Sequence, residues 1–104
     1  MQSKIYLSGP ITGTEDFMVR FAEAEEKLSA KGFNVVNPAK ENAALPKDTT
    51  WKGYMGESLK LLCGCDAIYM MRNWTRSMGA NVEYSVARQI GLVVFIEGEE
   101  EKMS

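Results

Sequence analysis

The sequence predicts an α/β fold: a single flavodoxin- or Rossmann-like domain with a parallel sheet of four to five strands and helices on both faces. Short β-favouring runs alternate along the chain with segments of helical periodicity, which is typical of such a sheet. The length of 104 residues suits one domain, and 45% hydrophobic with 25% charged residues is an ordinary globular composition. We expect the domain to cover residues 1–98 and an acidic tail to cover residues 99–104.

The first half of the chain predicts two strands, one helix and one long loop. Residues 4–8 favour a strand, and the Gly-Pro pair that follows them is a turn signal. Residues 15–31 have helical periodicity, and residues 33–36 form the second predicted strand. Residues 38–50 are polar, contain two prolines and lack periodicity, so they predict a loop of a length that often carries function. The apolar stripe of the helix consists of Phe17, Phe21, Ala24 and Leu28.

The second half repeats the alternation. Residues 51–63 and 80–90 predict helices, and a loop at residues 73–79 precedes the second of them. Residues 66–71 and 92–96 predict the third and fourth strands, and the apolar continuity of the third indicates that both of its faces are covered. The predicted helix stripes are Trp51, Met55, Leu59 and Leu62, and then Val82, Val86 and Ile90.

Charge and composition exclude several classes of function. A net charge of −2 and a pI near 5.2 argue against a nucleic-acid partner, which needs a basic face. The longest strongly apolar run, residues 92–96, is far shorter than the ~20 residues of a membrane span. Two cysteines and no apparent signal peptide favour a cytoplasmic protein. The absence of histidine removes the usual general base and most zinc sites, so we expect no metal.

Ligands of parallel α/β sheets bind where the strands end, which directs attention to the loop after the first strand. This loop reads Ser8-Gly9-Pro10-Ile11-Thr12-Gly13 and leads into a helix, where backbone N–H groups favour an anion. It is neither a dinucleotide-binding G-x-G-x-x-G motif nor a P-loop. The loop is therefore either a phosphate- or sugar-binding turn or a plain tight turn.

A second candidate segment opens the last predicted helix. Ser77 and Gly79 lie at its start, and Glu83 follows in what we expect to be its first turn. An acidic residue there can simply compensate the helix dipole. Alternatively, Glu83 faces the crevice at the strand ends, and Ser77 binds a phosphate with the helix N-terminus.

Other side chains have a structural and a functional interpretation. Trp51 and Tyr54 favour helix packing, whereas Trp74, on a crevice loop beside Asn73, is equally compatible with stacking on a base. The arginines at positions 72 and 76 are either surface charges or phosphate ligands. The C-x-C pair at residues 63–65 lacks the partners of a zinc site and the spacing of a redox motif.

Five segments together resemble the nucleoside 2-deoxyribosyltransferase-like superfamily. They are KIYLSGPITG, NVVNPA, WKGYM, CDAIYMM and NWTRSMGANVE, and they occur in the expected order from residue 4 to residue 83. The resemblance extends to the deoxynucleoside 5′-monophosphate N-hydrolases within that group. It implies an enzyme that needs no cofactor and acts on a small-molecule nucleotide or nucleoside.

The resemblance also implies roles for individual residues. Tyr6, Gly9, Ile11 and Gly13 match the pattern Tyr-x-x-Gly-x-Ile-x-Gly, which implies a sugar-phosphate pocket and a catalytic role for Tyr6 beside Glu83. The resemblance implies that the other substrate-binding residues of the matching segments are Ser8, Pro10, Asn73 and Trp74. Ser77, Gly79 and Glu83 match the nucleophile pattern Ser-x-Gly-x-x-x-Glu, in which Glu83 attacks C1′ and forms a glycosyl-enzyme. Free-nucleoside transferases carry an aspartate at the position of Ser77, and a serine there favours a monophosphate substrate.

Two features depart from the superfamily pattern. An aspartate expected in the second helix is replaced by Ser58, with Glu57 beside it but about 100° around the helix. A phosphate-binding serine that a neighbouring subunit supplies has no counterpart near the end of this chain, which offers Glu97 and Glu99. A nucleotide-binding module without catalysis is therefore the alternative function. We expect a homodimer or higher homo-oligomer in either case, because a sheet this small leaves apolar helix surface uncovered.

Overall fold

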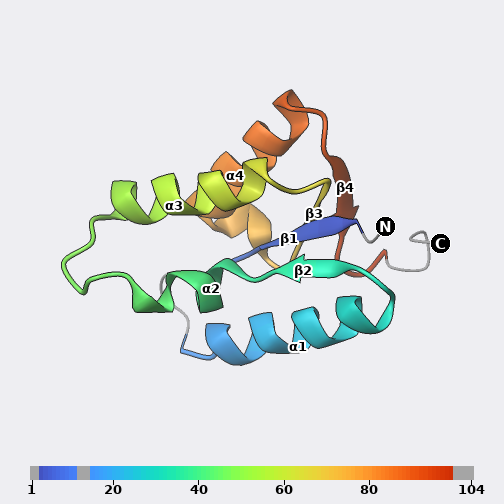
Figure 1. Ribbon diagram of the computed structural model, residues 1–104, viewed down its shortest axis with the longest axis horizontal. Coiled ribbons are helices and arrows are strands. Elements are labelled where there is room, and N and C mark those ends of the chain that lie inside the picture. The colour runs from blue at the N-terminus through green and yellow to red at the C-terminus, as the bar shows by residue number, and fades with distance from the viewer. Residues whose placement is uncertain (1–2, 12–14, 100–104) are drawn as a thin grey trace.

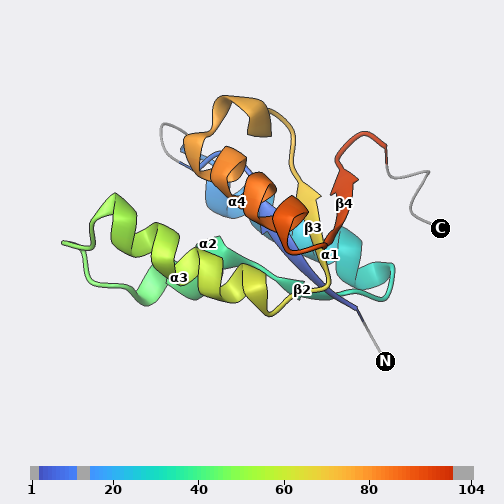
Figure 2. The ribbon, with the colours of Figure 1, turned by 90° about the horizontal axis from the view of Figure 1, so that it is seen from above.

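The computed structural model describes residues 3–11 and 15–99, and in them the chain forms one parallel sheet between two layers of helices (Figures 1 and 2). The sheet has four strands in the order β2-β1-β3-β4, all parallel. They are β1 (Lys4–Ser8), β2 (Asn34–Val36), β3 (Ala67–Met70) and β4 (Val93–Ile96). The predicted α/β class, with four to five strands, is confirmed.

Helices cover both faces of the sheet. They are α1 (Phe17–Ala30), the short α2 (Pro38–Glu41), α3 (Trp51–Cys63) and α4 (Met78–Gln89), with 3₁₀ turns η1 (Asn42–Ala44) and η2 (Trp74–Arg76). Figure 1 shows α1 and α2 below the sheet and α3 and α4 above it. The core has one cluster of buried side chains on each face, as a sheet with two covered faces requires.

Side chains alternate along β1, so successive residues of the strand point to opposite faces of the sheet. Ile5 and Leu7 join the cluster that packs against α1, whereas Tyr6 joins the cluster that packs against α3 and α4. Ser8 is two residues beyond Tyr6, so it faces the same side. Both side chains are buried, with 0% and 1% of their surface exposed. Two hydroxyl groups of β1 are thus directed towards the start of α4.

The strand order creates a topological switch point between β1 and β3. From β1 the chain turns to one face of the sheet and α1, and from β3 it turns to the other face and α4 (Figure 2). Ligands of such folds bind at this place. Gly9 closes the end of β1 against Met71, because a Cβ atom at Gly9 would lie 2.8 Å from the Met71 Cβ.

The predicted loop at residues 38–50 contains helical structure, which is a correction. Asn37 caps α2, its side-chain oxygen accepting a hydrogen bond from the Lys40 N–H at 3.2 Å, and Pro38 suits the first helical position. Turns this short leave no periodic stripe in a sequence. They place η1 opposite α3, where it borders the site described below.

The last helix begins earlier than predicted. Ser77 is its N-cap, with its hydroxyl oxygen accepting a hydrogen bond from the Ala80 N–H at 3.2 Å, so α4 starts at Met78 rather than at Ala80. Glu83 consequently lies in the second turn and not in the first, which contains no acidic residue. Compensation of the helix dipole, which is confined to the first turn, therefore does not explain Glu83.

No helix within residues 3–11 and 15–99 combines the length and the apolar character that crossing a membrane requires. The same residues contain no cluster of histidine, cysteine, aspartate or glutamate side chains that could hold a metal ion. Most of the predicted acidic tail lies outside the described residues.

Candidate active site

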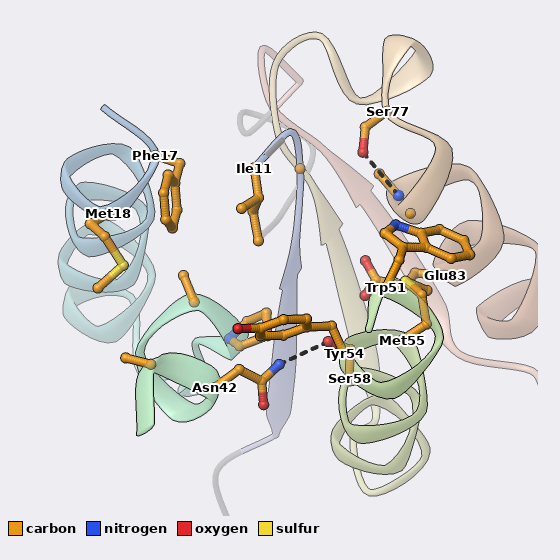
Figure 3. A pocket seen from close by; sticks show the side chains of 16 residues that line it. Ile11, Phe17, Met18, Asn42, Trp51, Tyr54, Met55, Ser58, Ser77 and Glu83 are labelled. Atoms are coloured by element: carbon orange, nitrogen blue, oxygen red, sulfur yellow. Dashed lines mark hydrogen bonds between the residues drawn. The ribbon is translucent and has the colours of Figure 1, made fainter. Parts of the chain in front are cut away.

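A cavity of about 350 Å³ lies at the C-terminal end of β1, between α1, α2, η1, α3 and the start of α4 (Figure 3). We call it the main cavity. Its walls are largely apolar, and Glu83 is the only side chain among the described lining residues that can carry a charge at neutral pH. The apolar walls include Ile11, Phe17, Met18, Trp51, Tyr54 and Met55, and the remaining polar side chains are Asn42, Ser58 and Ser77.

The Glu83 carboxylate is held by both hydroxyl groups of β1. The Tyr6 hydroxyl donates to its Oε2 at 2.5 Å, and the Ser8 hydroxyl donates to its Oε1 at 2.6 Å. Glu83 is only 7% exposed and lines the main cavity. Each carboxylate oxygen thus accepts one hydrogen bond and keeps further lone-pair capacity towards the cavity.

Burial raises the pKa of Glu83 above its ordinary value, while the hydrogen bonds from Ser8 and Tyr6 work in the opposite direction. Burial is the larger effect, so this carboxyl ionises at a higher pH than a solvated glutamate. Burial and the neighbouring Glu83 charge also raise the pKa of Tyr6 well above its usual range. Tyr6 therefore remains a protonated donor to the carboxylate.

Ser58 and Asn42 extend this hydrogen-bonded group across the cavity. The Asn42 side-chain amide donates to the Ser58 hydroxyl at 3.0 Å, and Ser58 is only 8% exposed (Figure 3). A hydrogen bond from Ser58 to the Tyr6 phenol partly opposes the rise in the pKa of Tyr6. Glu57 points elsewhere and pairs with Lys60 at 3.0 Å, outside the main cavity. Of the two candidate contributions from this helix, only Ser58 reaches the cavity.

A second depression of about 590 Å³, the adjoining cavity, shares Trp51, Ser77 and Gly79 with the main cavity. It is also lined by Pro10, Asn73, Arg20 and Arg76. The N-terminus of α4 and two guanidinium groups thus meet beside the carboxylate. Five of the predicted binding residues lie around the main cavity or contact its carboxylate: Ser8, Gly9, Ile11, Ser77 and Gly79. Two others, Pro10 and Asn73, line the adjoining cavity. Gly13 lies outside the described residues.

Two of the three aromatic residues considered for stacking are placed differently from the sequence expectation. Trp51 and Tyr54, expected to pack in the core, are 49% and 37% exposed and form part of the main cavity wall. The N-terminal turn of α3 lies beyond the part of the helix that is buried against the sheet, so its apolar stripe continues from core to cavity. Trp74 lines neither cavity and packs against Tyr84, with ring centroids 4.7 Å apart.

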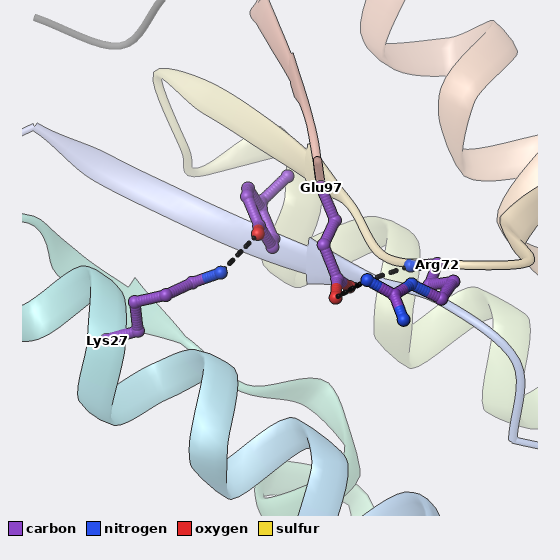
Figure 4. A network of polar contacts seen from close by, with 4 residues as sticks. Lys27, Arg72 and Glu97 are labelled. Carbon is purple, nitrogen blue, oxygen red and sulfur yellow. Dashed lines mark hydrogen bonds and ion pairs between the residues drawn. The ribbon is translucent and has the colours of Figure 1, made fainter. Parts of the chain in front are cut away.

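Arg72 is engaged away from both cavities. Its guanidinium group lies 3.9 Å from the Glu97 carboxylate, and its backbone N–H donates to the same carboxylate at 2.8 Å (Figure 4). Lys27 donates to the Tyr69 hydroxyl nearby at 2.9 Å. This polar cluster ties β4 to the end of β3. Of the two arginines at the crevice, only Arg76 faces the adjoining cavity.

Sequence reasoning did not assign several residues of the site. Phe17 and Met18 open α1 and form the wall opposite α3, Asn42 comes from the segment predicted as a loop, and Arg20 reaches the adjoining cavity. Phe17 belongs to the helix stripe, so periodicity placed it in the core. The only available signal for Asn42 was that the segment 38–50 was long and polar for a small domain.

Comparisons with known proteins agree with this architecture. The model of the family described as "Domain of unknown function (DUF4406)" matches residues 3–96. A solved structure of a 2-deoxyribosyltransferase from Bacillus psychrosaccharolyticus superposes with a TM-score of 0.72 at 19% identity, covering 90% of this chain and 71% of that one. No curated protein matches the chain. The predicted likeness to the nucleoside 2-deoxyribosyltransferase-like group is thus confirmed for the fold.

Proposed function

Because this chain belongs to the DUF4406 family and has a 2-deoxyribosyltransferase fold, we propose that it cleaves the N-glycosidic bond of a nucleoside 5′-monophosphate. One observation carries this proposal: the Glu83 carboxylate lines a cavity of suitable size while Tyr6 and Ser8 orient both of its oxygens. A carboxylate fixed in this way serves as the nucleophile at an anomeric carbon.

The reaction proceeds in two displacements. A Glu83 oxygen forms a bond to C1′ as the C1′–N bond breaks, and the electron pair of that bond leaves with the base. Water, or a second base, then attacks C1′ and releases the carboxylate, and the proton that the attacking molecule loses balances the one that the departed base takes up. Tyr6 and Ser8 hold the carboxylate in one orientation, which reduces the entropy lost on reaching the transition state.

The adjoining cavity supports a phosphorylated substrate. The N-terminus of α4 presents its dipole there, and Arg76 contributes positive charge. Arg20 also lines this cavity, but its charge is partly offset by an ion pair with Asp16 at 3.2 Å. The Ser77 hydroxyl uses its oxygen to accept the cap hydrogen bond from Ala80, so its own proton is available for a phosphate oxygen. A sugar in the main cavity would then direct its 5′ substituent past Ser77 and Gly79, which both cavities share.

Base release from a panel of nucleosides and their 5′-monophosphates tests the proposal. We expect release from monophosphates, abolished in Glu83→Ala and Glu83→Gln. Glu57→Ala is the matched control, because Glu57 is a glutamate of the neighbouring helix that lies outside both cavities. Absence of release from every compound would refute the enzyme. Tight binding without release would instead favour a nucleotide-binding module, the alternative that Ser58 in place of an acid suggests.

We also propose that the chain assembles into a homo-oligomer. Large apolar side chains remain exposed at the rims of the two cavities, and Met78 and Trp51 are 72% and 49% exposed. A second copy would cover this surface and close the site from solvent. Light scattering after size-exclusion chromatography measures the mass directly, and a monomer at micromolar concentration would exclude this assembly.

A further inference from the structure

Among the described residues, the main cavity contains one carboxylate and no second carboxyl that could protonate the leaving group. Glu83 is the only carboxyl among the described residues that line it. The other polar side chains are an amide, two aliphatic hydroxyls and one phenol: Asn42, Ser58, Ser77 and Tyr54. Amides and aliphatic hydroxyls do not act as general acids near neutral pH. The Tyr6 phenol donates a hydrogen bond to Glu83. Burial disfavours the phenolate anion that Tyr6 would become if it protonated a leaving group.

The walls of the cavity suit a flat group that carries positive charge. Phe17, Trp51 and Tyr54 present three aromatic rings, and Met18 and Met55 add polarisable sulfur (Figure 3). The only formal charge among the described lining residues is the negative charge of Glu83. Aromatic faces and a carboxylate both attract a cation more strongly than a neutral ring of the same shape.

We infer that the preferred substrates of this site are N-glycosides whose base is a cationic heteroaromatic ring, such as a pyridinium or an N-alkylated purine nucleotide. This inference rests on the proposed function. When the C1′–N bond of such a substrate breaks, its electron pair neutralises the ring nitrogen and the base leaves uncharged, so no acid is required. Glu83 forms the bond to C1′, water then replaces it, and the remaining proton of that water passes to solvent.

Nicotinamide mononucleotide and its reduced dihydropyridine form are matched probes, since they share the sugar, the phosphate and nearly the same base shape but differ in charge. We expect kcat/KM for the pyridinium form, and for its 2′-deoxy analogue, to exceed that of natural neutral-base monophosphates by about 100-fold or more, the factor that a general acid usually supplies. One proton should be released per turnover.

Adding an acid to the cavity supplies a second test. Ser58→Asp places a carboxyl beside the base site and is expected to raise neutral-base release about tenfold or more, whereas the uncharged Ser58→Asn is not. Circular dichroism and thermal melting determine whether each variant folds. If neither variant folds, the comparison of cationic and neutral substrates with the wild-type enzyme decides alone.

The outcomes separate this inference from the proposed function. Equal Glu83-dependent release of neutral and cationic bases would overturn the inference and leave the function standing. Loss of neutral-base release in Tyr54→Phe would also overturn the inference and leave the function standing, because the Tyr54 phenol would then be the general acid. No release of any base, cationic or neutral, would refute both.

Discussion

Removing one hydroxyl group from β1 tests the central geometry. Tyr6→Phe deletes the hydrogen bond of 2.5 Å to Glu83 but leaves the ring, which is fully buried, in its packing. The bond stabilises the ionised carboxylate relative to its protonated form. Its loss therefore raises the pKa of Glu83 further, because burial then acts with less opposition.

The magnitude follows from the type of bond. A hydrogen bond to a charged group contributes about 1.5–3 kcal/mol. Each 1.36 kcal/mol corresponds to a tenfold change in rate, so kcat/KM should fall about 10- to 150-fold on the acidic side of the profile. The loss should shrink as the pH rises, because the variant recovers its ionised nucleophile there.

The assay is kcat/KM for base release as a function of pH, which reports the ionisation of the free enzyme. We expect the acidic limb of the wild type to lie above the value of an ordinary glutamate, and that of Tyr6→Phe to lie higher still. Carbon NMR of the Glu83 carboxyl measures the same ionisation without substrate. Tyr84→Phe is the control, because the Tyr84 hydroxyl contacts Arg88 at 2.9 Å on the exposed side of α4.

An unchanged acidic limb in Tyr6→Phe would refute the reasoning, as would a limb displaced to lower pH. Either result means that the phenol does not stabilise the ionised form of Glu83. A uniform loss at every pH would assign Tyr6 to substrate contact instead. The same shift in Tyr84→Phe would show that the effect is not specific to the site.

The pKa of Glu83 is raised in the folded state, so folding stability falls as the pH rises above the pKa of an unfolded glutamate, about 4.3. The Tm of Glu83→Gln should therefore increase relative to that of the wild type as the pH is raised from this value. Gly9→Ala should lower the free energy of unfolding in urea by about 1–3 kcal/mol, because the added Cβ has no space beside Met71. Gly56→Ala should raise it by about 0.5–1 kcal/mol, because the position lies inside α3 and has open space around it. Ser77→Asp should keep the cap of α4 but lose the preference for monophosphates over nucleosides, measured as a ratio of kcat/KM. Thr50→Ala, which removes the equivalent cap of α3, should cost about 1 kcal/mol and keep that preference.

The fold was predictable because its signals are local and repeated. The strand at residues 4–8 and the helix at residues 51–63 were predicted with the bounds they have in the structure, since each joins a clear periodicity to a turn or cap residue. The short α2 and η1 were not predicted, because α2 depends on the Asn37 cap and on packing against α1 and β1, and η1 depends on packing against α3, rather than on an apolar stripe.

Part of the site also follows from the sequence. Tyr6 and Ser8 are two residues apart in a strand, so they share a face, and strand-end geometry directs attention to Glu83. The roles of Trp51 and Tyr54 do not follow in the same way. A helical stripe shows which side of a helix is apolar but not how far the sheet beneath it extends, so periodicity cannot distinguish a core residue from a cavity wall. Trp74 shows the opposite case: it lies outside the long helices, at a position compatible with ligand stacking, yet its ring packs against Tyr84.

The balance of forces at Glu83 distinguishes a reactive carboxylate from a structural one. Buried charges in protein cores are usually stabilised by a countercharge, yet Glu83 has only two neutral donors, Tyr6 and Ser8. These donors offset burial incompletely, because burial remains the largest influence on its pKa. A side chain that served stability alone would gain from replacement by an uncharged residue, and nothing in its packing requires the charge. The proposed nucleophilic role would account for the charge, since a carboxylate that has no salt-bridge partner among the described residues would keep its electron density for an electrophile entering the cavity.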